Sequence, residues 1–116
     1  MKNELFFQGD VLIEKVNNAP ITENLIPSDP DGSIVLARGE VTGHRHRFTG
    51  DSGVVMFRDD GLARDIPANL YIGHVNVSKE ATLLHEEHDK ITLKPGSYRI
   101  RRQREWTAGD ARVVAD

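Results

Sequence analysis

The chain has 116 residues, of which 38% are hydrophobic and 28% are charged, the balance of a soluble globular protein about one domain long. It contains no cysteine, which excludes a disulfide framework and any thiolate metal site. The formal net charge of −3 gives no electrostatic reason to expect nucleic acid as a partner. The apolar runs are too short to span a membrane and no secretory segment follows Met1, so we expect a cytoplasmic protein without membrane association.

The first half of the chain is predicted to form strands around one long loop. Residues 6–16 carry β-branched and aromatic side chains and predict a strand. Residues 17–33 are rich in Asn, Pro, Asp and Ser, which favours a loop that is either a flap over a site or a surface excursion. A further strand is expected at 33–41. Residues 50–53 form a tight connection into the strand at 54–58, in the manner of a hairpin.

The second half continues with short strands and turns. Strand composition covers residues 68–77, 81–85, 90–94 and 97–106. Lys94-Pro95-Gly96-Ser97 has Pro and then Gly at its central positions, as a type II turn requires. Residues 107–110 resemble a capping box with Asp in place of Glu, which predicts a short C-terminal helix through Val114.

These elements predict an all-β fold, with one β domain over residues 1–116. A small barrel or sandwich closes the edges of such a set of short strands. Many small barrels associate through an edge strand, so a homodimer through Phe6-Phe7 or through the last strand is an expectation.

Four of the five histidines lie in two short clusters, which are the candidate site. On a strand, residues i and i+2 point to the same side with side chains roughly 7 Å apart, so His44 and His46 can converge on one ion. Neutral imidazole suits Zn, Fe, Ni or Cu. The cofactor expected for this chain is a divalent transition metal, Zn, Fe, Ni or Mn. The first cluster therefore predicts a pair of metal ligands.

The second cluster, His85-Glu86-Glu87-His88, is the other dense group of donor side chains. If the segment is extended, His85 and His88 lie on opposite faces. If it turns, they face the same way at i, i+3 spacing. A glutamate beside an ion could act as a general base. The predicted metal ligands are His44, His46, His85 and His88.

A second interpretation of the same residues involves no metal. His-x-His pairs also occur on solvated strands, and residues 86–89 can be an exposed acidic turn. His74, between Gly73 and Val75, has no donor nearby in the sequence and is expected to be a packed or surface histidine. The chain has no Gly-x-Ser-x-Gly motif and no phosphate-binding glycine loop, which leaves a nucleophilic mechanism without support.

Residues 98–106 interleave four arginines with aromatic side chains, a combination that can contact phosphate or stack on bases. On a strand, Arg99 and Arg101 share one face and the other two lie opposite, so the charge is split. We therefore expect pairing with acidic side chains of the chain itself. An inner arginine, Arg102 or Arg104, could bind an anionic ligand or a metal-site carboxylate.

Two stretches resemble the cupin superfamily. Gly43-His44-Arg45-His46 is similar to the first cupin metal motif, and Ile91–Tyr98 is similar to the strand, Pro-Gly, strand passages of that superfamily. The resemblance implies a cupin-like barrel in which His44 and His46 are ligands. The glutamate expected a few residues after His-x-His is absent, and the resemblance leaves the other two ligands unassigned.

The chain as a whole is also similar to a group of small uncharacterised bacterial and phage proteins, a likeness that implies no known activity. The matching stretches are residues 8–11, 39–47, 85–88 and 102–106.

Two functions follow as hypotheses. The first is a small soluble β-barrel protein that binds a divalent transition metal, with any activity being metal-assisted chemistry on a small-molecule ligand. The second is a non-enzymatic accessory or protein-interaction module, phage-related and without metal. A pocket enclosing the histidines favours the first. Histidines on a flat wet face, or more than about 10 Å apart, favour the second, because metal–ligand bonds are only ~2 Å long.

Overall fold

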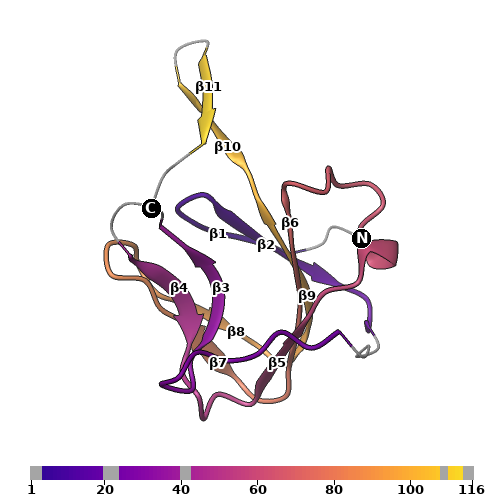
Figure 1. Cartoon of the computed structure of the whole chain (residues 1–116), viewed down its shortest axis with the longest axis vertical. Helices are drawn as coiled ribbons and strands as arrows, with labels where there is room; N and C mark the ends of the chain where they lie inside the picture. Colours follow the sequence, from indigo (N-terminus) through magenta and orange to yellow (C-terminus); the bar gives the residue numbers. More distant parts are fainter. Residues whose placement is uncertain (1–3, 20–23, 40–42, 108–109, 114–116) are drawn as a thin grey trace.

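Short β-strands joined by turns form nearly all of the structure (Figure 1). This computed structural model describes residues 4–19, 24–39, 43–107 and 110–113, with side chains as far as residue 103. The strands are β1 (Leu5–Gln8), β2 (Val11–Val16), β3 (Ile34–Arg38), β4 (Arg45–Phe48), β5 (Val54–Phe57), β6 (Tyr71–Val77), β7 (Ala81–Leu83), β8 (Ile91–Leu93), β9 (Gly96–Arg102), β10 (Arg104–Thr107) and β11 (Asp110–Val113). Within these ranges the one helical element is the 3-10 turn η1 (Asp60–Leu62), and no helix is long and apolar enough to cross a membrane. The predicted all-β class is confirmed.

One layer of the fold is a five-stranded antiparallel sheet in the order β1-β2-β9-β6-β5. Its strands alternate as a sheet with one buried face requires, so that Val11 and Ile13 of β2 are fully buried while Leu12 between them is partly exposed. At the β5 edge, the backbone of residues 24–26 runs alongside, and the Ile26 amide donates to the Met56 carbonyl. At the β1 edge, Leu5 and Phe7 are exposed.

The opposite layer consists of two ribbons, β3–β4 and β7–β8, which lie across the core from the sheet (Figure 1). A single antiparallel bridge joins the ribbons, because Arg47 and Leu84 exchange backbone hydrogen bonds of 3.0 and 2.8 Å. This bridge places the chain after β7 beside β4. The two segments that carry the paired histidines are therefore neighbours.

The hydrophobic core fills the space between the layers. Tyr98 from β9 and Phe48 from β4 are its largest fully buried side chains, one from each layer. Burying a side chain of this size stabilises the fold by roughly 1.5–3 kcal/mol. Among the described residues, hydrogen bonding does not close the layers into one barrel, since the sheet ends at β1 and β5. The cupin-like barrel of the prediction is not confirmed.

Two predicted connections differ in the structure. The single strand expected at 6–16 is a hairpin, because Gly9, with φ of 58°, and Asp10 form a two-residue turn between β1 and β2. The hairpin expected around residues 50–53 is wrong. Strand β4 pairs with β3 and strand β5 pairs with β6, so this connection crosses from one layer to the other.

The predicted C-terminal helix is also wrong. Arg104 pairs with Val113 and Thr107 with Asp110, so β10 and β11 form an antiparallel ribbon that projects beyond the two layers (Figure 1). The physical reason lies in the sequence between the strands. Thr107 and Asp110 have the spacing of a capping box, which favours a helix. The two residues between them, Ala108-Gly109, end in glycine and equally suit the turn of a hairpin.

Candidate metal centre

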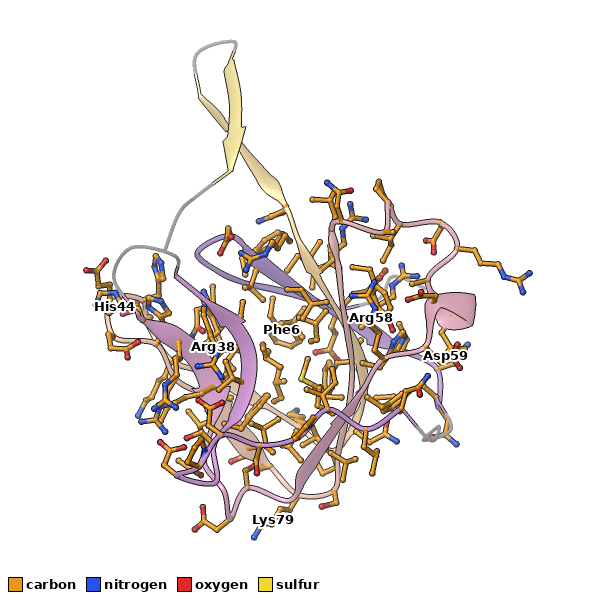
Figure 2. All side chains as sticks on the ribbon, viewed as in Figure 1. Phe6, Arg38, His44, Arg58, Asp59 and Lys79 are labelled. Carbon is orange, nitrogen blue, oxygen red and sulfur yellow. The ribbon has the colours of Figure 1, made fainter. Side chains whose placement is uncertain are left out.

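The structure brings the four predicted ligand histidines to one place. The ring centroid of His85 lies 4.3 Å from that of His46 and 4.6 Å from that of His88. Its distance from the His44 centroid is 5.6 Å. Figure 2 shows His44 at the end of the β3–β4 ribbon, across the core from Arg58 and Asp59. The ring of His85 is thus the one in contact with each of the other three. We call His44, His46, His85 and His88 together the four-histidine group.

The loop between β7 and β8 explains how two of these rings meet. After Leu84 the chain bends over residues 86–88 before it enters β8. Of the two conformations left open by the sequence, the structure has the turn, and His85 and His88 lie on the same side. The ring of His88 is also nearly parallel to that of His46, at 6.1 Å and 10°.

Two histidines of the four-histidine group and the neighbouring Glu86 lie close enough together to bind one ion. A ring nitrogen from each of His44 and His85 and a carboxylate oxygen of Glu86 all lie within 4.8 Å of one another. The Arg45 backbone amide donates to Glu86 Oε1 at 2.9 Å. This hydrogen bond is the largest cause of the lowered pKa of Glu86, so the carboxylate is ionised at neutral pH.

Residues of the long predicted loop hold Arg45 from outside the group. The Arg45 guanidinium donates to Asp29 at 2.8 Å and to Asp31 at 3.0 Å. Asp29 is also bonded to Arg38. The Arg45 hydrogen bond is the main reason that the pKa of Asp31 is lowered. This part of the loop therefore contacts Arg45, the residue between His44 and His46 at the start of β4.

His46 is the most enclosed histidine, with an exposed fraction of 0%. Its Nδ1 lies 2.8 Å from Gln8 Oε1. The Gln8 amide nitrogen donates to two backbone carbonyls, of Leu83 at 3.2 Å and of Asp89 at 2.9 Å. Because both carbonyls can only accept, the Gln8 oxygen must face His46, and His46 Nδ1 must carry a proton. Gln8 thereby determines the tautomer of the ring.

Asp10 lies on the other side of the His46 ring and is 1% exposed. Its Oδ1 is 3.7 Å from His46 Nε2, and its Oδ2 accepts from Arg102 Nη1 at 2.5 Å. Burial alone would raise the pKa of Asp10, but the neighbouring His46 ring and the Arg102 guanidinium bring it below its usual range. A buried, ionised carboxylate therefore stands beside the innermost histidine.

Sequence reasoning missed Gln8 and Asp10. The available signal was the polar pair around Gly9 inside a stretch of strand composition, which marks a tight turn with polar side chains next to it. An inner arginine, Arg102 or Arg104, was predicted to bind an anionic ligand or a metal-site carboxylate. Arg102 pairs with the Asp10 carboxylate, and the metal at this carboxylate stays a prediction. Outside the group, Arg99 pairs with Glu14 and Asp65, as intramolecular pairing predicts.

A small cavity opens beside the four-histidine group. Its volume is about 140 Å³, and it is lined by Arg45, Arg47, Leu84, His85 and Glu86. Sites for drug-sized ligands are typically 300–1,000 Å³. Only a ligand of few atoms fits this cavity.

The fifth histidine is separate from the group and is packed in the protein, as predicted. His74 is 2% exposed, stacks on Phe57 and has its Nδ1 2.7 Å from the Tyr71 hydroxyl. Burial, followed by the positive charge of Arg99, lowers the pKa of His74. Its surroundings are those of a structural histidine.

Fold and site together define an all-β domain with a candidate metal centre at the contact between its two layers. The chain belongs to the family described as Domain of unknown function (DUF8820), which matches residues 7–103. The match includes the four-histidine group as well as Gln8, Asp10 and Arg102. No curated protein and no solved structure matches the chain. Membership agrees with the expected uncharacterised family, while the resemblance to cupins and to bacterial and phage proteins stays a prediction.

Proposed function

We propose that this domain binds a divalent transition metal ion, such as Zn, Fe, Ni or Mn, in the four-histidine group. The observation that carries the proposal is the trio of His44, His85 and Glu86, whose donor atoms lie within 4.8 Å of one another. Ligand atoms around a tetrahedral zinc ion are each about 2 Å from the metal and so roughly 3.4 Å apart. Binding would therefore draw the trio closer, through rotation of the rings.

The chemistry of the donor set supports this choice of ion. Imidazole nitrogens with a carboxylate suit borderline transition metals, and the chain has no thiolate that would favour softer ions. The ionised Glu86 supplies the negative charge that offsets the charge of the cation. The separation of the rings, 4.3 to 6.1 Å between neighbouring centroids, supports a shared site over independent surface histidines.

The adjacent cavity supports a small-molecule ligand as the partner of such an ion. A zinc ion held by three protein ligands keeps a fourth position for water or substrate, and it can lower the pKa of bound water to about 7. The cavity of about 140 Å³ includes His85 and Glu86 in its lining. Metal-assisted chemistry on a molecule of few atoms is the activity proposed for this site.

Titration with Co(II), followed by its visible absorption, tests the proposal on protein without a histidine tag. The parent is expected to develop a saturable spectrum of bound Co(II). Glu86→Gln should weaken binding by at least about tenfold, the size expected for losing a metal-site partner. Glu80→Gln is the matched control, because Glu80 is exposed in the turn before β7. Equal binding by the parent and both variants would contradict the proposed ligands, and a parent that binds no Co(II) would contradict the proposed function.

A further inference from the structure

Two buried polar atoms at the inner side of the four-histidine group face each other without a hydrogen bond. His46 Nε2 and Asp10 Oδ1 lie 3.7 Å apart, in side chains that are 0% and 2% exposed. Neither atom has a hydrogen-bond partner among the described residues. Buried polar atoms in folded proteins nearly always have a partner, so this pair requires a specific cause.

The protonation of His46 follows from its neighbour. The Gln8 amide nitrogen is committed to the carbonyls of Leu83 and Asp89, so Gln8 Oε1 accepts the Nδ1 proton of His46. In the neutral ring the other nitrogen, Nε2, then carries only a lone pair. That lone pair lies on the side of the ring that faces Asp10.

The charge of Asp10 makes this arrangement unfavourable without a cation. Arg102 donates to Oδ2 and its guanidinium pairs with the carboxylate as an anion, so Oδ1 also presents lone pairs. Two electron-rich atoms thus face each other in a space without solvent. A histidine that donates one ring proton to a neighbouring oxygen and offers the other nitrogen has the arrangement found in metal sites.

We infer that Asp10 and His46 form the inner half of the metal site, with Asp10 Oδ1 and His46 Nε2 as ligands to the ion. Gln8 and Arg102 are positioning residues, because each binds the atom of the ligand side chain that faces away from the ion. The inference rests on the proposed function and adds a carboxylate ligand to it. The separation of 3.7 Å is close to the roughly 3.4 Å between ligands of a tetrahedral zinc ion.

A second proton on the His46 ring, instead of a metal ion, explains the separation of His46 and Asp10 less well. A doubly protonated His46 would have to donate to Asp10 over 3.7 Å, whereas N–H···O bonds span 2.7–3.2 Å. A metal ion between the two atoms requires no hydrogen bond across this distance, and the ring of His85, whose centroid lies 4.3 Å from that of His46, is placed to supply a further ligand.

The direct test is NMR of protein with ¹⁵N-labelled histidines, first metal-free and then loaded with ¹¹³Cd. In the metal-free protein, the His46 Nδ1 signal should be that of a protonated ring nitrogen that donates a hydrogen bond to Gln8. After loading, His46 Nε2 should show a one-bond coupling to ¹¹³Cd. Coupling to other histidines but not to His46 would overturn the inference and leave the proposed function intact. Absence of any cadmium binding would overturn both.

A pair of variants tests the carboxylate separately. Asp10→Asn should weaken ¹¹³Cd binding by at least about tenfold. Asp65→Asn is the matched control, because Asp65 also pairs with an arginine, Arg99, but lies outside the site. Unchanged binding in Asp10→Asn would overturn the assignment of Asp10. If Asp10→Asn does not fold, the His46 coupling in the parent decides the inference, since it requires no substitution.

Discussion

The His46 ring and the Gln8 carboxamide are joined by a buried hydrogen bond of 2.8 Å between Nδ1 and Oε1. This bond connects β4 of one layer with β1 of the other. Gln8 also donates to Leu83 and Asp89, at the two ends of the loop that carries the second histidine cluster. One side chain therefore connects the three segments from which the candidate site is built.

Replacing Gln8 by alanine should lower the free energy of unfolding by about 2–5 kcal/mol, because the change removes three hydrogen bonds and leaves the buried His46 Nδ1 without its partner. Urea unfolding of the metal-free protein measures this effect. Thr92→Ala, an exposed substitution in β8, is the control and should stay within about 0.5 kcal/mol of the parent. A Gln8→Ala variant as stable as the control would show that this hydrogen-bond network does not hold the segments together.

Gly73→Ala should destabilise the sheet. Gly73 is buried at an irregularity in the pairing of β6 with β9, and a Cβ there would lie 2.8 Å from the Phe57 carbonyl oxygen. The strands must separate locally to accept a methyl group, at a cost of about 1–3 kcal/mol. Thermal unfolding of Gly73→Ala beside Gly61→Ala, in the exposed turn η1, measures the difference. A Gly73→Ala protein as stable as the parent would contradict the close approach of β5 and β6.

The lowered pKa of His74 should make the folded protein less stable in mild acid. Burial lowers its pKa in the folded protein, so the unfolded chain binds the proton more readily between the folded pKa and about 6.5. The free energy of unfolding is therefore fully retained above about pH 6.5 and falls below it, by up to about 1.4 kcal/mol per pH unit. It stops falling once the pH passes the folded pKa.

Urea unfolding at about pH 7.5 and about pH 5.5, with a chelator present, checks this linkage. The parent should lose more stability between the two values than His74→Gln, which cannot take up the proton. Equal losses in the two proteins would mean that His74 has the same proton affinity in the folded and unfolded chain.

Metal binding should change one backbone amide in a recognisable way. In the structure, the Glu87 amide donates to His85 Nδ1 at 3.0 Å, so a neutral His85 carries its proton on Nε2. This is not the tautomer that binds metal through Nε2. If His85 binds the metal through Nδ1, the metal displaces the Glu87 amide from that atom. If His85 binds through Nε2, the ring proton moves to Nδ1, which can then no longer accept a hydrogen bond.

In either case the Glu87 amide loses its partner, and its proton signal should shift and exchange faster with solvent when Zn²⁺ is added. The amide of Thr82, within β7, serves as the reference. An unchanged Glu87 amide in a fully loaded protein would exclude His85 from the coordination shell.

The predictions from sequence succeed where the information is local. Alternation with a period of two predicts that His46 and Phe48 share one face, and both are buried in β4, while a short strand expected at 90–94 is found at Ile91–Leu93. Prediction failed at the 9–10 turn because strand composition continues on both sides of it. It failed at Thr107–Asp110 because the same residue types can begin a helix or close a hairpin.

The inner part of the candidate site is not accessible to such reasoning, because it depends on pairings distant in sequence. Gln8 and His46 are separated by 38 positions, and Asp10 and Arg102 by 92. Only the pairing of β2 with β9 and the facing of the two layers bring these side chains together. The local sequence marks a tight turn at Gly9, but it does not show that the polar side chains beside this turn are buried.

Elemental mass spectrometry of the tag-free protein, purified after growth with added Zn, Fe, Ni and Mn, tests the central claim most directly. The account predicts about one equivalent of a transition metal in the parent and a loss of that metal in a His44→Ala/His46→Ala double variant, since both side chains are proposed ligands. A His74→Gln protein should keep the metal. A parent that is purified without metal and takes up none of the four ions on titration would contradict the account.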